Sequence, residues 1–302
     1  MTTAATKAAE SGRIELKLQS YFQMTKPTIS LLVMFTALPT MFMTSRGLPD
    51  LGLMFAILFG TYLASSSSAI FNHVLDSDID ATMTRTRKRP MVQGAVNPEW
   101  AIVLAVTLGA ASFCLLTLAA NPLTAWVALL ANWFYVVVYT LWLKRRTPQN
   151  IVIGGAAGAV GPLIGWAGMT GSIGWEAWVL FLVIFLWTPP HFWALAIKYK
   201  DDYSAANIPM LPSVKGLETT RRQIFLYTLL LIPTTLSLFW FGGAHIGYLV
   251  ASLGCSLYFS YLAFRLLRSR KLEHAMPVFL FSLVYIFAIF GVLAIEEFLY
   301  LL

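Results

Sequence analysis

Long apolar runs recur along the whole chain, and they constrain its fold more than any other feature. Each run is about 20 residues long, which is the length that an α-helix needs to cross a bilayer. The 302 residues are 58% hydrophobic and 12% charged, which leaves too little polar surface to coat a soluble globule. We therefore predict an all-α, polytopic membrane helical bundle. The nine expected spans are 28–45, 51–71, 99–119, 123–143, 151–171, 175–197, 223–243, 245–267 and 276–296.

The basic residues of the loops predict the topology. With these spans, 20 of the 21 Lys and Arg residues fall on one side of the membrane, and only Arg46 falls on the other. The positive-inside rule then places the N-terminus in the cytoplasm and the C-terminus on the opposite side. We expect a cytoplasmic N-terminal segment over 1–27 and a single membrane domain over 28–302. No cleavable signal or transit peptide is evident, which favours a bacterial inner (plasma) membrane.

The polar residues that follow the second span form a ladder of oxygen ligands. Asn72, Asp76 and Asp80 are four residues apart, so on a helix they share one face over about 12 Å. A basic run over 85–89 comes directly after them. Carboxylates near a membrane are costly unless they are paired or hydrated, so they indicate function. Together the ladder and the basic run predict a site for Mg²⁺ and a diphosphate.

Three polar clusters converge on the cytoplasmic face. Spans two, four and six all run inward, and they end at the ladder, at 139–147 and at 198–203. A central cavity that opens at this face can take a water-soluble head group while an apolar tail lies among the helices. Spans two and six also lead into acidic clusters at similar spacing, which hints at a duplicated helical unit.

Four sequence blocks in this order resemble the UbiA superfamily of intramembrane prenyltransferases and, within it, the heme O synthases (protoheme IX farnesyltransferases). The first block is Asn72-x₃-Asp76-x₃-Asp80 with the following Arg89-Pro90. The others are Tyr139-Thr-x-x-Leu-Lys144-Arg145-x-Thr147, Trp187-Thr-Pro-Pro-His191-Phe-Trp193, and Asp201-Asp202-Tyr203 followed by 208–212. The resemblance covers about residues 20–300.

The resemblance implies a reaction and its partners. The farnesyl group of farnesyl diphosphate is joined to a vinyl group of heme B with addition of water, which gives heme O and diphosphate for terminal oxidases. Mg²⁺ is the implied cofactor, and heme B is a substrate. Membrane lipid surrounds the protein, and a heme A synthase or a terminal-oxidase assembly protein is a candidate partner. No motif for nucleic-acid binding is present.

The matched positions suit this chemistry, because Mg²⁺ prefers hard oxygen donors and phosphates bind Lys and Arg. Asn72, Asp76 and Asp80 are the expected catalytic residues, with Asp76 and Asp80 as metal ligands and Asn72 as a neutral ligand or orienting group. The expected diphosphate-binding residues are Arg85, Arg89, Lys144, Arg145 and Lys198. Asp201 and Asp202 are expected to bind a second Mg²⁺. Lys198 stands where the wider superfamily has a carboxylate, so the second cluster departs from the pattern.

Two histidines lie near the expected site. His73 follows the ladder's first residue, and His191 lies in span six near Trp187. Imidazole is a common axial ligand of heme iron, so we expect these three residues to contact heme. The alternative for each histidine is a hydrogen-bonded structural group.

Other residues have simpler expected roles. Asp78 falls off the ladder face and is expected in a solvated loop. The glycines of span five are expected at close helix contacts. Cys114 and Cys255 are expected to be small buried apolar residues.

Two other functions fit parts of the pattern. Prenylation of a quinone-precursor aromatic would share the ladder but should not need the block over 187–193. A proton- or ion-coupled transporter would place ionisable groups at mid-membrane. Spans one, three, five, seven and eight contain none in their interiors, which favours catalysis at one face.

Overall fold

The computed structural model describes residues 18–45, 47–269 and 271–302. Every regular element in these ranges is a helix, and eight helices are long and apolar enough to cross a membrane. A bent pair, Leu18–Met24 with Pro27–Met43, raises the number to nine when it is counted as one span. The predicted all-α, multi-pass membrane fold is confirmed. Of the expected N-terminal segment over 1–27, residues 1–17 lie outside the described residues.

The helices follow the expected spans closely. The elements are α2 (Pro27–Met43), α3 (Leu51–Leu75), α4 (Ser77–Thr82), α5 (Pro98–Ala119), α6 (Pro122–Trp133), the π-helix η1 (Phe134–Leu143), α7 (Asn150–Gly158), α8 (Gly161–Thr170), α9 (Trp175–Lys198), α10 (Lys200–Ala205), α11 (Leu211–Val214), α12 (Gly216–Trp240), α13 (Ile246–Ser269), the 3₁₀-helix η2 (Leu272–His274) and α14 (Ala275–Tyr300).

Polar caps set several helix boundaries. Asn97 and Asn121 each precede a proline at the first helical position, and each side chain accepts a backbone N–H of the following turn. This pairing suits a helix start, because proline lacks the N–H that would be unsatisfied there. Asp50 accepts the N–H of Leu53 in the same way at the start of α3.

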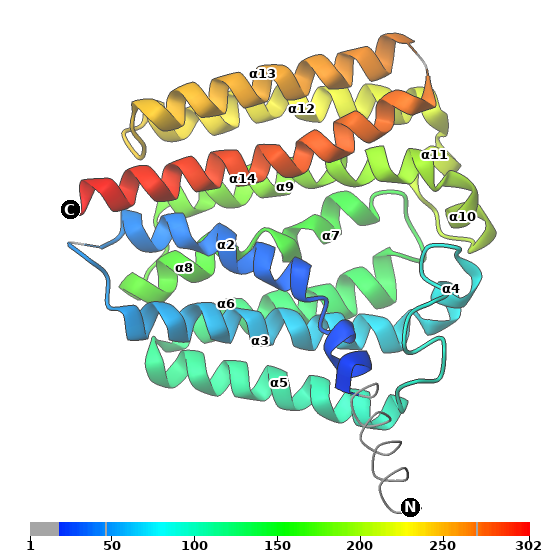
Figure 1. The fold of residues 1–302 in the computed structure, drawn as a ribbon, viewed down its shortest axis with the longest axis horizontal. Coiled ribbons are helices and arrows are strands. Elements are labelled where there is room, and N and C mark those ends of the chain that lie inside the picture. The colour runs from blue at the N-terminus through cyan, green and yellow to red at the C-terminus, as the bar shows by residue number, and fades with distance from the viewer. Residues whose placement is uncertain (1–17, 46, 270) are drawn as a thin grey trace, which may run out of the picture.

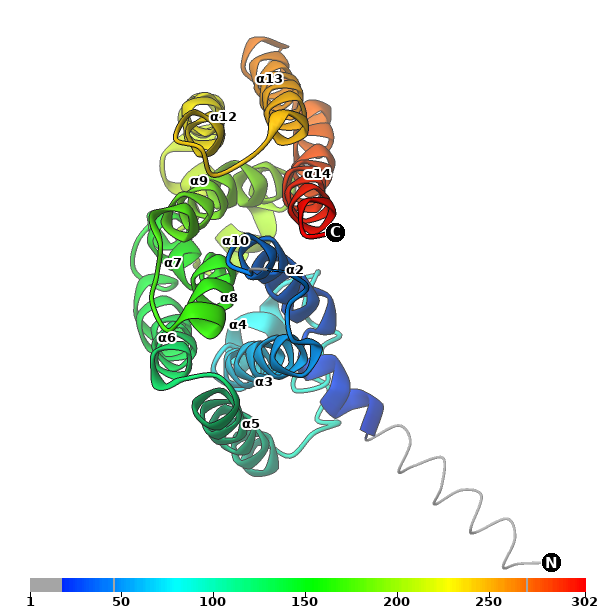
Figure 2. The same ribbon diagram turned by 90° about the vertical axis from the view of Figure 1, so that its left-hand side faces the viewer.

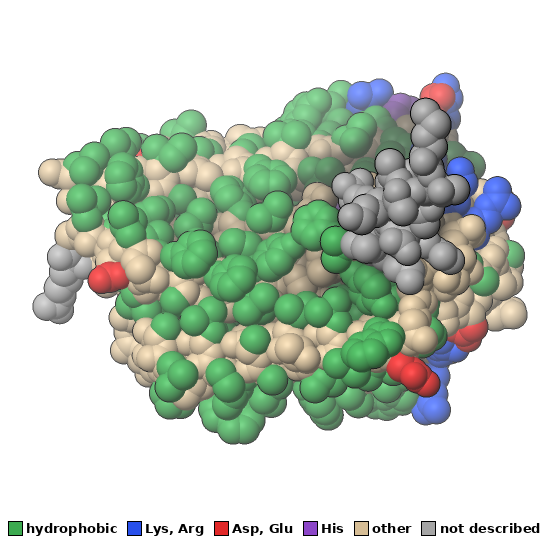
Figure 3. Space-filling model, turned by 60° about the horizontal axis from the view of Figure 1, so that its bottom comes forward, with side chains coloured by type: hydrophobic (Ala, Val, Ile, Leu, Met, Phe, Trp, Pro, Cys, Tyr) green, Lys and Arg blue, Asp and Glu red, His purple; other side chains and the backbone are tan. Residues whose placement is uncertain are grey.

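The spanning helices surround a central region, and the short helices α4, α10 and α11 lie together at one end of the bundle (Figure 1). In the view of Figure 2, α12 and α13 pack outside α9 and α14, and α5 packs outside α3. The space-filling view of Figure 3 shows hydrophobic side chains over the face in view and most of the visible Lys and Arg toward one end. This distribution is the one a membrane-spanning bundle needs.

Three spans change direction or geometry along their length. The second span breaks at Asp76, between α3 and α4. The fourth span changes from α-helix to a ten-residue π-helix, and the fifth is interrupted between Gly158 and Gly161. Irregular backbone at membrane depth is tolerated where it is covered by protein or lines a cavity.

Glycines allow α2 and α8 to pack closely. A Cβ atom at Gly165 would lie 2.4 Å from the carbonyl oxygen of Ala37, and one at Gly161 would lie 2.7 Å from that of Val33. Backbone atoms cannot move aside as a flexible side chain can. The expectation that these glycines serve helix packing is confirmed, except at Gly158, where a Cβ would meet nothing within 4 Å.

The expectation for the cysteines is wrong at Cys114, which is exposed on the lipid-facing side of α5, whereas Cys255 is half-buried. Both lie in apolar spans, but an outer helix such as α5 has few neighbours to cover its side chains.

We expect Gly165→Ala to destabilise the protein by about 1–3 kcal/mol, the usual cost of overpacking, because the new methyl group forces α2 and α8 apart. Gly254→Ala is the matched control, since a Cβ there meets nothing within 4 Å and alanine favours a helix. Thermal unfolding in the same detergent checks both. Equal melting temperatures for the two variants would contradict the close contact.

Candidate active site

A cavity of about 500 Å³ lies at the polar end of the bundle. Its walls come from five regions of the chain that are distant in sequence. The lining residues are Gln23, Lys26, Ile29, Asn72, His73, Asp80, Met83, Arg85, Lys88, Arg89, Pro90, Tyr135, Tyr139, Lys144, Phe192, Tyr203 and Met210. The cavity therefore combines carboxylate, amide and cationic groups with an aromatic wall.

The ladder spans the junction of two helices. Asp76 lies between α3 and α4, with φ −98° and ψ 7°. The Asp76 N–H still donates to the Asn72 carbonyl at 3.0 Å, and the Asp80 N–H donates to the Asp76 carbonyl at 2.8 Å. One-turn spacing is thus retained across the break. All three side chains are buried, with Asp76 0% exposed.

Each ladder side chain is hydrogen-bonded to a cation, and Asp76 has a second one nearby, since Arg145 Nη2 lies 3.9 Å from Asp76 Oδ1. Lys144 Nζ donates to Asp76 Oδ2 at 2.5 Å, and Arg89 Nη1 donates to Asp80 Oδ2 at 2.5 Å. Lys26 Nζ donates to Asn72 Oδ1 at 2.6 Å. These pairs offset the cost of burying the carboxylates. They also bring two expected diphosphate-binding residues, Arg89 and Lys144, directly onto the expected metal ligands.

Lys26 is a site residue that sequence reasoning missed, because it was counted only as a positive-inside charge. Its backbone adopts a left-handed conformation, with φ 47° and ψ 59°. That conformation is unfavourable for a residue with a Cβ and marks a place that the surrounding structure holds. The signal available in the sequence was its position directly before Pro27, at the start of the first span.

The π-helix builds one wall. Its Tyr135 and Tyr139 are one turn apart, with ring centroids 5.3 Å from each other, and both line the cavity. Thr140 Oγ1 accepts from Asn72 Nδ2 at 3.2 Å, which ties this wall to the ladder. A Cβ at Gly154 would collide with the Tyr139 ring, so that glycine leaves room for the ring.

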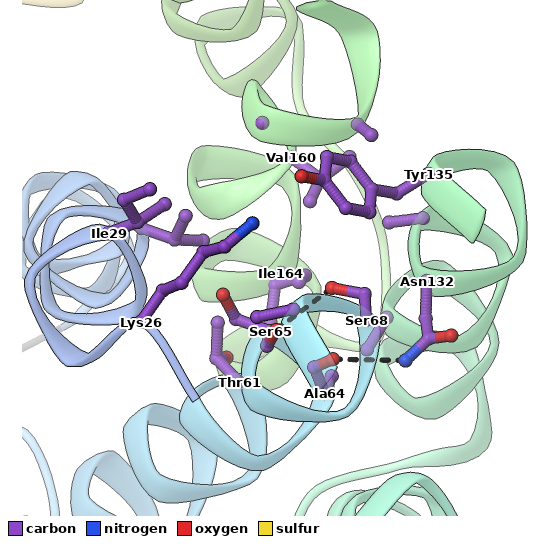
Figure 4. A pocket seen from close by; sticks show the side chains of 16 residues that line it. Lys26, Ile29, Thr61, Ala64, Ser65, Ser68, Asn132, Tyr135, Val160 and Ile164 are labelled. Atoms are coloured by element: carbon purple, nitrogen blue, oxygen red, sulfur yellow. Dashed lines mark hydrogen bonds between the residues drawn. The ribbon is translucent and has the colours of Figure 1, made fainter. Parts of the chain in front are cut away.

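A second pocket of about 90 Å³ continues from the cavity between α2, α3, α6 and the α7–α8 break. It shares Lys26, Ile29 and Tyr135 with the larger cavity. Figure 4 shows Lys26 and Tyr135 pointing into the space above Ser65 and Ser68 of α3. Most of the other lining residues are alanine, glycine or aliphatic. The space beneath the charged groups is therefore mainly apolar.

The remaining polar residues of the first cluster brace it from outside the cavity. Arg145 donates to both carboxylate oxygens of Asp78 at 2.8 Å and to the Leu75 carbonyl at 2.8 Å. The Arg145 guanidinium lowers the pKa of Asp78. Asp78 is exposed as expected, but it lies in α4 and not in a loop. This pair lines a separate surface pocket.

The second acidic cluster also lies outside the cavity lining. Asp202 accepts from Thr84 Oγ1 at 2.9 Å and from the Arg85 backbone N–H at 3.4 Å. Asp201 and Lys198 are exposed. The predicted convergence of the three clusters is confirmed by the contacts of Asp202 with the 84–85 segment, together with those of Lys144 and Arg145 with the α3–α4 junction. Tyr203 brings α10 to the cavity wall, and burial raises the pKa of its hydroxyl.

The two histidines differ in their surroundings. His73 lines the cavity, is 3% exposed, and neither of its ring nitrogens has a hydrogen-bond partner. His191 is half-buried between α9 and α14, outside the cavity lining, and its ring stacks on Trp187 at 4.4 Å. Trp187 is buried, and its Nε1–H donates to the Ser282 carbonyl at 2.7 Å.

The carboxylate and amide oxygens of the ladder form a candidate metal site. Among the described residues, no three His, Cys, Asp or Glu side chains form a group that could hold one. The ladder nevertheless offers carboxylate and amide oxygens, and Asp76 Oδ1 is buried without a hydrogen-bond partner. Mg²⁺ usually takes one or two carboxylates and completes its shell with waters and phosphate oxygens. The ladder fits that mode of binding, with a diphosphate as the second source of oxygens.

The chain is similar in sequence to known prenyltransferases of one family. The chain matches the model of the UbiA prenyltransferase family over residues 33–288. It is 46% identical to the protoheme IX farnesyltransferase of Gloeobacter violaceus over 286 residues, which cover 94% of each chain. It is 47% identical to that of Trichodesmium erythraeum over 284 residues, which cover 92% of this chain and 86% of the relative.

Solved structures share the fold. A UbiA homologue from Archaeoglobus fulgidus, solved with DMAPP and Mg²⁺, superposes with a TM-score of 0.67 at 17% identity, covering 91% of this chain and 99% of its own. A digeranylgeranylglyceryl phosphate synthase superposes with a TM-score of 0.76 at 16% identity, covering 93% and 99%. At this identity the likeness concerns the fold alone.

We expect Lys144→Gln to weaken binding of Mg²⁺ with inorganic diphosphate by about tenfold or more, because loss of a charged partner at a buried site costs at least 1.4 kcal/mol. Arg145→Gln should weaken it by no more than about threefold, since Arg145 lies outside the cavity. Isothermal titration in nanodiscs measures both. An equal loss in the two variants would support the original assignment of Arg145 to the diphosphate.

Proposed function

Because the chain belongs to the UbiA prenyltransferase family, we propose that it transfers the farnesyl group of farnesyl diphosphate to a vinyl group of heme B, with addition of water. The products are heme O and diphosphate. Identity of 46% over nearly the full length with a protoheme IX farnesyltransferase supports this acceptor. The observation that carries the chemistry is the cavity in which the buried Asp80 carboxylate, several cations and an apolar pocket meet. Neither the quinone-precursor reaction nor the transporter is favoured by the relatives.

The charged wall binds and orients the diphosphate. Asp76 and Asp80, with Asn72, would hold Mg²⁺, which when bound neutralises charge on the leaving diphosphate oxygens. Arg89 and Lys144 lie on these carboxylates and would turn toward the phosphate oxygens when the diphosphate enters. Arg85 and Lys26 also line the cavity and add positive charge to it. Cations and dipoles fixed in place before the reaction stabilise the charge that develops as the allylic C–O bond breaks.

The apolar wall protects the reacting carbon. The farnesyl C1 atom loses its bond to the diphosphate oxygen and gains a bond to the terminal vinyl carbon. A water oxygen then bonds to the inner vinyl carbon, and the proton of that water passes to solvent. The rings of Tyr135, Tyr139 and Phe192 exclude other water until the carbon–carbon bond has formed.

Heme contact is assigned to His191, Trp187 and His73. His191 lies about 10 Å from the end of α9 at 1.5 Å per residue, within reach of the polar face. Its ring between aromatic side chains suits an axial ligand of heme iron. His73 brings an unpaired imidazole to the cavity wall, where it would contact the acceptor from the diphosphate side.

The outer residues have supporting roles in this proposal. Arg145 holds Asp78 and the end of α3, and Asp202 holds the segment that carries Arg85. A second Mg²⁺ on Asp201 and Asp202 and a diphosphate contact by Lys198 stay predictions.

We expect purified protein with heme B, farnesyl diphosphate and Mg²⁺ to form a porphyrin heavier than heme B by one farnesyl group and one hydroxyl group. Mass spectrometry detects this product, and EDTA should abolish it. Asp76→Asn and Asp80→Asn should each lower turnover by about a hundredfold or more, the usual effect of removing one preorganised electrostatic group.

Asp78→Asn is the matched control for those variants, since it removes a neighbouring carboxylate that is exposed and paired with Arg145 and is not one of the buried ladder carboxylates. It should keep turnover within about threefold of the native protein. Full turnover by Asp76→Asn at limiting Mg²⁺ would contradict the metal assignment. A prenylated phenolic acid with unchanged heme B would move the acceptor to the quinone-precursor class.

The cavity is proposed to face the cytoplasm of a bacterial inner membrane, because the basic loops lie at its end of the bundle. A heme A synthase or an oxidase assembly protein would then take the product from the same membrane. Alkaline phosphatase fused after Leu302 should be active, since this enzyme needs an oxidising compartment, and a fusion within 91–97 should be inactive. The reverse pattern would contradict the orientation.

A further inference from the structure

We propose that Ser282 is a positioning residue that sets the tautomer of His191 and so leaves the Nε2 atom of that histidine free to bind heme iron. This inference rests on the proposed function. Ser282 lies on α14, whereas His191 lies on α9, so the contact joins two spans that are 91 residues apart in sequence.

The hydrogen bonds of Ser282 determine which nitrogen of His191 carries the proton. Ser282 Oγ lies 2.6 Å from His191 Nδ1 and 2.5 Å from the Phe279 carbonyl oxygen. The carbonyl can only accept, and serine has one hydroxyl hydrogen, so that hydrogen is donated to Phe279. Ser282 Oγ must then accept from His191, and Nδ1 carries the proton. In the neutral imidazole the remaining lone pair is on Nε2.

The Nε2 atom is available for a ligand. It has no hydrogen-bond partner among the described residues. It is also not fully buried, in contrast to the two unpaired ring nitrogens of His73. Nε2 is therefore open to its surroundings, while Nδ1 is fully used. Metal-binding histidines typically donate the other ring N–H to a fixed acceptor, which sets the ring orientation and raises the basicity of the ligand.

Aromatic rings fix the plane of the His191 imidazole. The ring stacks on Trp187 at 4.4 Å and 19° and on Phe279 at 4.8 Å and 29°. Trp187 is itself anchored by its Nε1–H to the Ser282 carbonyl. Ser282 thus contacts the histidine through its hydroxyl and the stacking ring through its carbonyl. A ring clamped on both faces can present only its edge, which is the part that carries Nε2.

Among the described residues, Ser282 is the side chain that hydrogen-bonds to the His191 ring. Apart from Ser260, whose Oγ has no hydrogen-bond partner, the buried serines and threonines of α12 and α13 bond to their own helix backbones or to other hydroxyls of the core. Ser256, for example, lies 3.1 Å from the Tyr285 hydroxyl and 3.3 Å from Thr235 Oγ1. Ser256→Ala is therefore a matched control, since it removes a buried hydroxyl from a neighbouring helix without touching His191.

The test is heme B binding by purified protein in nanodiscs. We expect Ser282→Ala to weaken heme affinity by about tenfold or more, in the range for loss of a hydrogen-bond partner of a metal ligand. The iron–histidine stretching band of the ferrous protein should also shift in resonance Raman spectra, which a purely structural role would not cause. His191→Ala should abolish the band, and Ser256→Ala should leave both band and affinity unchanged. Native affinity and an unshifted band in Ser282→Ala would overturn the proposal.

A second measurement needs no change at Ser282. The ¹⁵N spectrum of histidine-labelled protein without heme reports the tautomer directly, with His191→Gln to assign the signal. A proton on Nδ1 is expected, and a proton on Nε2 would overturn the proposal even if Ser282→Ala failed to fold.

The outcomes separate this inference from the proposed function. Native protein that makes heme O but shows no iron–histidine band would remove the ligand role of His191 and leave farnesyl transfer in place. Native protein that shows the band but forms no farnesylated heme would remove the proposed function and leave the heme site.

Discussion

The pairing of buried carboxylates with cations is the interaction on which this site depends. Asp76 is fully buried at the end of a membrane span, where an unpaired charge would cost several kcal/mol. Lys144 removes that cost, and it reaches Asp76 only because the fourth span ends at the same face as the second. The electrostatic balance of the site therefore requires this topology of the bundle. Such a pair adds little net stability, so under the proposed function its cation would exchange the carboxylate for an oxygen of an entering diphosphate.

The irregular parts of the helices are where the site is assembled. The break at Asp76 turns α4 so that Asp80 meets Arg89, and the π-helix brings Tyr135 and Tyr139 to one wall. The interruption between α7 and α8 opens the apolar pocket beside Gly158. Straight helices would pack these positions against neighbours and close the space. Close packing elsewhere, such as the contact of α2 with α8, stabilises the bundle around these irregular segments.

Apolar length and loop charge were enough to predict the class of fold and most span boundaries, because both act locally along the chain. The ladder could be recognised for the same reason, since its one-turn spacing is local and is retained across the break at Asp76. Lys26 could not, because its contact with Asn72 spans 46 residues and depends on a left-handed turn that sequence does not reveal. The placement of Arg145 outside the cavity could not be predicted either. Lys144 and Arg145 are adjacent, and the residue at which η1 ends determines that the Lys144 side chain, and not that of Arg145, lines the cavity.

The two acidic units show how one local pattern acquires two roles. In each, a span of 24 or 25 residues ends at a single non-helical residue, followed by a six-residue helix with two acids in its first turn. This likeness supports the duplicated unit that the sequence hinted at. In the first unit Asp80 turns into the cavity and meets a cation. In the second, Asp202 turns toward the first unit and holds the backbone of Arg85. The helix α10 therefore holds the basic segment in place from outside the cavity, through the contacts of Asp202 with Thr84 and with the Arg85 backbone.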